Sequence, residues 1–289
     1  MRVIVVVLFL TMAVYSETIL LMTSNGKVER YKSMEKSFSE AIQKDFTRID
    51  IGQMSQIQIK EYLYDNYPDI VYAIGTKAYQ YANKYIPEKK IFFSSIVNFK
   101  RLKMGKNSFG VSNELHTGMK LTLIKSLLSQ TKTLSIIYSS YTQTIFESFK
   151  KEANNVGIHI VGQKIDKDDS FDIEKLRNTD AFVMIADPIL LKSEDKIKIL
   201  YKKLKKSNTP IIAYHPLYIK YGAVLVLSVD TDIVGQQVAS MVEGSIRGHT
   251  FKEIQNPISS KVIFNQGLAN KIRLHYNKSA LGIVNRVIK

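Results

Sequence analysis

The sequence contains no cysteine. Disulfide bonds, thiolate metal sites and cysteine nucleophiles are therefore excluded, and so is a lipid anchor on an N-terminal cysteine. Long apolar stretches are also missing, because no segment approaches the roughly 18 consecutive apolar residues of a membrane-spanning helix. We therefore expect a soluble mature protein.

Signatures of catalysis are missing as well. The chain has no G-x-S-x-G elbow, no H-E-x-x-H, no G-x-x-x-x-G-K and no G-x-G-x-x-G after its first predicted strand. Its histidines are scattered, and no two have the spacing of metal ligands: His116, His159, His215, His249 and His275. We expect no enzyme activity, no cofactor and no metal site.

Acidic residues are outnumbered, with 26 Asp and Glu against 41 Lys and Arg, which gives a formal net charge of +15. The lysines of Lys192–Lys206 flank apolar positions in the pattern of a solvated helix face. This pattern disfavours nucleic acid as a partner. Weak attraction to an anionic membrane surface fits the charge better.

The N-terminus reads as a secretory signal. Met1 and Arg2 precede the apolar run Val3–Val14, which is too short to span a bilayer comfortably. Small residues then permit cleavage after Ser16, so residues 1–16 are the predicted signal peptide. The alternative, a buried first strand, is disfavoured because Thr18–Met22 supplies that strand. We expect an exported protein that floats freely in the periplasm without a lipid anchor.

Apolar runs bounded by turn residues alternate with amphipathic segments, which is the pattern of α/β folds with buried parallel strands. The predicted strands are Thr18–Met22, Thr47–Gly52, Ile70–Ile74, Lys90–Ser94, Ser108–Ser112, Thr133–Tyr138, Ile158–Gly162, Ala181–Ile185, Pro210–Ala213 and Ala223–Ser228.

The two halves of the chain repeat one another. Asp69–Ile74 is matched by Asp180–Ile185, and Ile91–Ser95 by Pro210–Tyr214, at offsets of about 110 to 120 residues. Because the segments have a similar order and a similar type in both halves, the sequence predicts two similar lobes with a cleft between them.

The sequence resembles the ABC transporter substrate-binding protein family of the tryptophan- and tyrosine-binding type, which has the type I periplasmic-binding fold. Six segments in order, over nearly the whole mature chain, carry this resemblance: Asp69–Thr76, Gly110–Ser112, Leu121–Tyr138, Asp180–Asp187, Pro210–Ala213 and Gly222–Asp230 with Gly235.

The resemblance implies two doubly wound parallel-sheet lobes joined by three crossover strands. The crossovers would be Ser112–Glu114, Ser228–Asp232 and about Pro257–Lys261. Residues 17–112 and 231–258 would then form the N-terminal lobe, and residues 113–230 and 259–289 the C-terminal lobe.

Functionally, the resemblance implies capture of a small solute in the inter-lobe cleft and its delivery to an inner-membrane ABC permease. We expect an amino acid or a related carboxylated compound, which can be aromatic, and a monomeric protein. The alternative is a periplasmic sensing module that presents the bound solute to a membrane receptor.

Ligands of open parallel sheets bind beyond the carboxyl ends of the strands, near helix N-termini that attract anions. Hydroxyl groups there can hold a carboxylate, and glycine permits close approach to the backbone. The same side chains also serve as helix caps and turn residues, and this reading stays open. The candidates in the first lobe are Ser24, Asn25, Gly75, Thr76, Ser94 and Ser95.

The second lobe offers a different chemistry. Asp187 could pair with an ammonium group or cap the following helix, and Pro188 replaces a polar amide that the family often has there. Aromatic rings could hold a planar solute, although Tyr214 and His215 could equally be packing and turn residues. Asp230 could contact the ligand or only cap a helix. The full set is Tyr141, Thr142, Asp187, Tyr214, His215 and Asp230.

Overall fold

A computed structural model describes residues 17–96, 99, 102–166 and 171–289. The predicted signal peptide and its cleavage after Ser16 lie outside the described residues. The chain divides into two compact units. The first comprises the chain up to Gly110 together with Val238–Glu253, and the second comprises Val111–Gln237 and Ile254–Lys289.

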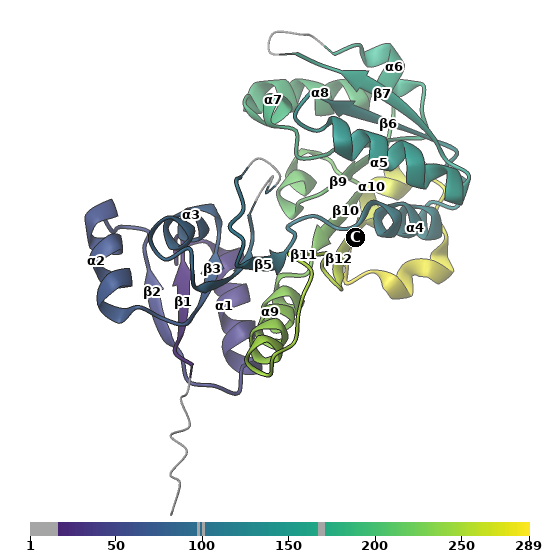
Figure 1. The fold of residues 1–289 in the computed structure, drawn as a ribbon. Coiled ribbons are helices and arrows are strands. Elements are labelled where there is room, and N and C mark those ends of the chain that lie inside the picture. The colour runs from purple at the N-terminus through teal and green to yellow at the C-terminus, as the bar shows by residue number, and fades with distance from the viewer. Residues whose placement is uncertain (1–16, 97–98, 100–101, 167–170) are drawn as a thin grey trace, which may run out of the picture. The chain divides into compact units, whose positions relative to one another are not determined.

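The first unit is built on a six-stranded sheet with the order β11-β5-β4-β3-β1-β2 (Figure 1). Its strands β1 to β5 pair in parallel. The elements of the first unit are β1 (Ile19–Thr23), α1 (Glu29–Ala41), β2 (Thr47–Asp50), α2 (Gln56–Asn66), β3 (Ile70–Ile74), α3 (Thr76–Tyr85), β4 (Lys90–Ser94) and β5 (Ser108–Val111). The helix α9 (Thr231–Ile246) belongs to this unit from Val238 onwards, and the edge strand β11 (Ile254–Gln255) is assigned to the second unit.

The second unit contains a seven-stranded sheet with the order β13-β12-β10-β9-β8-β6-β7. Its elements are α4 (Thr117–Leu127), β6 (Thr133–Tyr138), α5 (Gln143–Ala153), η2 (Asn154–Val156), β7 (His159–Lys164), α6 (Ile173–Arg177), β8 (Ala181–Val183), α7 (Pro188–Leu191), α8 (Glu194–Lys206), β9 (Ile211–Ala213), η3 (Pro216–Tyr221), β10 (Leu225–Val229), β12 (Ser260–Asn265), α10 (Gln266–Lys271), η4 (Lys278–Ile283) and β13 (Arg286–Ile288).

The two sheets share one topology. In the first, β5-β4-β3-β1-β2 lie side by side, and in the second β10-β9-β8-β6-β7 take the same places. The internal repeat predicted from the sequence is confirmed, because each matched pair of segments occupies the same position in its sheet. All ten predicted strands are present, with ends that differ by up to two residues.

Helices cover both faces of the second sheet, as the doubly wound prediction requires. One apolar cluster joins α4, α5 and α10 to the sheet, and the other joins α6, α7 and α8 to it. The pairing of β10 with β12 is antiparallel, whereas the other pairs recorded in this sheet are parallel. The lysine-rich helix α8 behaves as predicted: its buried residues are apolar, and Lys202, Lys203, Lys205 and Lys206 are exposed.

The matched aspartates Asp69 and Asp180 perform the same task in the two sheets. Asp69 accepts hydrogen bonds from the backbone N–H and hydroxyl of Thr18, just before β1. Asp180 accepts bonds from the backbone N–H groups of Lys132 and Thr133 and from the Thr133 hydroxyl, at the start of β6. Each carboxylate therefore fixes the start of a neighbouring strand.

These bonds lower the pKa of both groups. The backbone hydrogen bond from Thr18 holds the pKa of Asp69 below its usual value. Burial alone would raise the pKa of Asp180, but the bonds from Lys132 and Thr133 outweigh it and lower the pKa. Both aspartates therefore stay ionised in acid longer than ordinary carboxyl groups.

The boundaries of the units differ in detail from the predicted lobes. The predicted N-terminal lobe starts its second segment at residue 231, whereas residues 231–237 group with the second unit. This difference falls inside α9, which is one continuous helix over Thr231–Ile246. Residues 111–112 and 254–258 of the predicted N-terminal lobe also group with the second unit. Within the described residues, no helix is long and apolar enough to cross a membrane.

Candidate functional site

Three adjacent strands of the first sheet, β4, β3 and β1, end beside one another. Their registers align Ile74 with both Thr23 and Ser94. The backbone continues this pairing, since Ser24 N–H donates to Ile74 O and Gly75 N–H donates to Ser94 O, each at 2.9 Å. The sequence-predicted residues of this lobe therefore meet at one carboxyl edge.

The N-terminus of α3 opens onto this edge. Its N-cap is Gly75, which has φ +90° and no side chain to cap the helix. Ser24 supplies the cap instead, because its Oγ accepts from Ala78 N–H at 2.9 Å. A Cβ on residue 75 would lie 2.7 Å from Ser24 Oγ and 2.8 Å from the Tyr31 hydroxyl. Glycine is therefore required here both by the backbone conformation and by the lack of space.

Thr76, the first residue of α3, is partly exposed. Among the described residues, the backbone N–H groups of Thr76 and Lys77 have no acceptor. Free N–H groups at a helix N-terminus, together with the helix dipole, attract an anion.

Three buried polar atoms at this edge have no hydrogen-bond partner among the described residues: Thr23 Oγ1, Arg30 Nε and Ser95 Oγ. Arg30 lies in the first turn of α1, and its guanidinium carbon is 5.1 Å from the centre of the Tyr31 ring. Ser95 is 2% exposed and has φ +58°, a left-handed conformation that costs energy for a residue with a side chain. Buried unpaired polar atoms and backbone strain concentrate at functional sites.

Sequence reasoning missed Arg30, because one basic residue on an amphipathic helix looks like an ordinary surface residue. The signal that could have found it is its place, in the first turn of the helix that follows β1.

Two predicted residues of this lobe have local structural roles. Asn25 Oδ1 accepts from Lys27 N–H at 2.9 Å, which closes a turn. Ser94 is fully buried, and its hydroxyl lies 2.7 Å from the Tyr72 hydroxyl. Asn25 therefore has the turn role that the sequence left open, and Ser94 has a packing role in the interior.

In the second unit, Asp187 is fully buried and is the N-cap of α7. One carboxylate oxygen accepts from the backbone N–H groups of Ile189 and Leu190. The other accepts from Ser139 N–H, the Ser139 hydroxyl and the Thr142 hydroxyl. The structure therefore shows the capping role, and five donors already surround the group for which pairing with an ammonium was the alternative.

Thr142 is fully buried and belongs to this network, whereas its neighbour Tyr141 is 47% exposed at the same loop. His215 is exposed, and its Nδ1 accepts from Leu217 N–H at 3.2 Å, which caps η3. Asp230 is partly exposed and accepts from Asp232 N–H at 3.3 Å. His215 therefore has the local turn role considered in the sequence, and Asp230 has the capping role.

Tyr214 is partly exposed and lines a narrow crevice at the carboxyl ends of β8 and β9, beside the middle of β10. The crevice has a volume of about 10 Å³, enough for about one water molecule. Apart from Tyr214 and Lys120, its walls are apolar, and α4 and α5 close it on one side. Lys120 was not predicted from the sequence.

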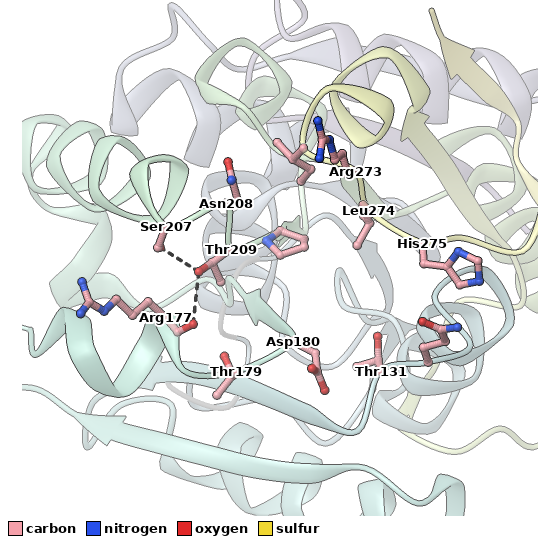
Figure 2. A pocket seen from close by; sticks show the side chains of 13 residues that line it. Thr131, Arg177, Thr179, Asp180, Ser207, Asn208, Thr209, Arg273, Leu274 and His275 are labelled. Atoms are coloured by element: carbon pink, nitrogen blue, oxygen red, sulfur yellow. Dashed lines mark hydrogen bonds between the residues drawn. The ribbon is translucent and has the colours of Figure 1, made fainter.

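A larger pocket of about 300 Å³ lies in the second unit, where β6, β8 and β9 begin (Figure 2). Thr131, Asp180 and Thr209 line it at the start of these strands. Figure 2 shows Arg177 and Arg273 on separate parts of its rim, pointing away from one another. The pocket has no converging cations, and it lies at the opposite end of the strands from the predicted ligand residues.

The described residues include no group of three or more His, Cys, Asp or Glu side chains that could hold a metal ion.

Comparison with known proteins agrees with this architecture. The sequence profile of the ABC transporter substrate binding protein family matches residues 24–288. The chain belongs to the ABC transporter substrate-binding protein family. No curated protein matches the sequence at a significant level.

Solved structures share the fold of this substrate-binding protein at low sequence identity. The ligand-free, open structure of a substrate binding protein with adhesive properties from Clostridium difficile has a TM-score of 0.72 at 14% identity, over 95% of this chain and 100% of the other. The ABC domain in complex with L-Trp from Streptococcus pneumonia has a TM-score of 0.59 at 17% identity, over 93% and 100%. A periplasmic ribose ABC transporter from Conexibacter woesei has a TM-score of 0.56 at 9% identity, over 89% and 94%.

These findings confirm the predicted family and the type I periplasmic-binding fold. Family and fold are those of solute-binding proteins, which take a small-molecule ligand and have a membrane permease as partner.

Proposed function

We propose that this substrate-binding protein serves an ABC importer and captures an amino acid or a related carboxylated solute, including aromatic ones. Support comes from the family match over residues 24–288. A relative of the same fold from Streptococcus pneumonia was solved in complex with L-Trp.

The observation that carries this proposal is the carboxyl edge of the first sheet. The solute's carboxylate binds against the free N–H groups of Thr76 and Lys77, where the positive end of the α3 dipole favours an anion. Arg30 supplies the full positive charge, and the Ser95 hydroxyl donates a further hydrogen bond. Arg30 Nε and Ser95 Oγ are buried without a hydrogen-bond partner among the described residues, and a carboxylate would satisfy both.

Two aromatic side chains of the second unit lie at strand ends, where ligands of open parallel sheets bind. Tyr214 and Tyr141 follow β9 and β6, and both keep part of their surface exposed. An amphipathic ring can cover a planar apolar group while its hydroxyl remains hydrogen-bonded.

The same proposal places the mature protein in the periplasm after removal of residues 1–16. N-terminal sequencing of the secreted product by mass spectrometry should find Glu17 as the first residue. A cytosolic product that retains Met1 would contradict export.

Calorimetry and thermal unfolding with a panel of amino acids and carboxylic acids test the binding role. One solute should bind strongly and stabilise the protein by about 2.7 kcal/mol at a hundredfold excess over Kd. Arg30→Met should weaken its binding by about 10- to 100-fold, since a hydrogen-bonded charge is lost.

Arg48→Met is the matched control in the same unit. Arg48 lies on β2, and its guanidinium is 3.5 Å from Glu35 at the exposed surface. Its loss should leave affinity unchanged. The function proposed here would fail if no solute bound, either from the panel or from a cell extract analysed by mass spectrometry.

A further inference from the structure

Helix α8 of the second unit exposes a cationic face at its C-terminal end. The buried side chains of the helix are apolar and pack in one of the two clusters of this unit. Its last residues include four exposed lysines: Lys202, Lys203, Lys205 and Lys206. None of the four has an ion pair among the described residues. Lys202 and Lys206 are four positions apart, where like charges repel, so a negatively charged partner would stabilise this end of the helix.

Acidic side chains near this face are paired with other cations. Glu194 and Asp195, in the first turn of α8, lie 3.2 Å and 3.8 Å from the Lys198 amine. On the neighbouring helix α6, Glu174 pairs with Arg177. The acidic start of α8 is therefore balanced within the helix, whereas the lysines at its end are not.

An exposed isoleucine lies among these lysines. Ile199 is 48% exposed, although it is a large apolar residue. Lys202, Lys203 and Lys206 follow it by three, four and seven positions, which places the four residues on one face of the helix. Lysines attract anionic lipid headgroups, and an apolar side chain between them can enter the boundary between headgroups and acyl chains.

We propose that the outer face of α8, formed by Ile199, Lys202, Lys203 and Lys206, docks on an anionic phospholipid bilayer. The lysines pair with lipid phosphates, and Ile199 enters the headgroup layer. The formal net charge of +15 attracts the whole protein in the same direction. None of these residues belongs to the proposed solute site, so this inference does not depend on the proposed function.

The ordinary explanation for such a face is solvation, together with the favourable placement of lysines at the negative end of a helix dipole. A solvated face binds no lipid. A general attraction between a basic protein and an anionic surface, in turn, would not depend on which lysines are removed.

Co-sedimentation with lipid vesicles tests the proposal. Both sheets lie within residues 17–289, and this form of the chain is used so that the apolar run Val3–Val14 does not itself bind lipid. It should bind vesicles of equimolar phosphatidylcholine and phosphatidylglycerol but not vesicles of phosphatidylcholine alone. Binding should weaken as sodium chloride is added, because salt screens exposed charges.

A triple variant, Lys202→Gln with Lys203→Gln and Lys206→Gln, should bind the anionic vesicles about 10- to 100-fold more weakly. The matched control replaces three other exposed lysines of the second unit by glutamine: Lys150, Lys151 and Lys271. These lie in the last turns of α5 and α10, which pack in the other apolar cluster of the unit. The control removes the same charge from helix C-termini and should retain most of the affinity.

Ile199 is tested separately. Ile199→Ser should weaken binding to the anionic vesicles by about 5- to 10-fold, whereas Ile199→Leu keeps an apolar side chain and should bind as the wild type does. Thermal unfolding should show each variant to be folded, because the substituted side chains are exposed.

Three results would overturn the proposal. A wild-type protein that does not bind the anionic vesicles at low salt, or binds both kinds of vesicle equally, would exclude docking on anionic lipid. Equal losses in the two triple variants would reduce the attraction to net charge and remove the special role of α8. Tighter binding to poly-L-glutamate than to the vesicles would indicate an acidic protein as the partner in place of a bilayer.

Discussion

Replacing Asp187 by asparagine distinguishes a structural carboxylate from a ligand-binding one. The substitution keeps the shape of the side chain but leaves one acceptor oxygen in place of two. The amide nitrogen that replaces the other oxygen cannot accept a hydrogen bond. It faces two or three buried donors, because Asp187 accepts five hydrogen bonds in the structure. An unsatisfied buried donor costs about 1–3 kcal/mol, so we expect a loss of about 2–5 kcal/mol in the free energy of unfolding.

Urea unfolding followed by circular dichroism measures this loss, fitted with two transitions because the chain has two units. The transition of the second unit should move to lower urea concentration. Asp195→Asn is the matched control on α8, where the side chain is 87% exposed and 3.8 Å from Lys198. Its effect should stay within about 0.5 kcal/mol.

A shift below about 1 kcal/mol for Asp187→Asn would refute this reasoning. So would a variant of normal stability that no longer binds its solute, because the carboxylate would then face the ligand.

Three further predictions follow from the backbone and the charges. Gly75→Ala should lower the free energy of unfolding by about 1–3 kcal/mol. Gly157 also has a positive φ but has open space around it, so Gly157→Ala should lower the free energy of unfolding by only about 1 kcal/mol. Equal losses in chemical denaturation would contradict the steric argument. Ser95→Gly should raise the free energy of unfolding by about 1 kcal/mol and weaken solute binding, and a stabilised variant with full affinity would remove the hydroxyl from the site. Asp69→Asn and Asp180→Asn should lower the thermal midpoint at pH 7, and this difference should shrink as the pH falls through the lowered carboxyl pKa values; a constant difference down to about pH 2 would contradict the pKa shifts.

The strands could be predicted because each is a short run of buried apolar residues between turn signals. Ile70–Ile74 illustrates this, since all five of its residues are buried. The C-terminal strands β12 and β13 were not predicted as sheet members. They follow the duplicated part of the chain, so the repeat gave no template for them, and β12 pairs antiparallel with β10.

The candidate site was harder to predict, because polar side chains at strand ends look alike in the sequence. Asp187 could be a ligand or a cap, and the donors that satisfy it come from Ser139 and Thr142, more than forty residues away. Arg30 and Lys120 could not be told from surface cations, since what distinguishes them is three-dimensional: Arg30 Nε is buried without a hydrogen-bond partner among the described residues, and Lys120 lines an apolar crevice.

The cap of α3 comes from the residue that follows β1 and not from the residue that precedes the helix. Two functions that one residue usually combines are therefore divided between different residues. Ser24 maintains the helix, while Gly75 and Thr76 leave its first turn open. Under the proposed function, a substitution at position 76 would change the contacts with the ligand without removing the cap of α3.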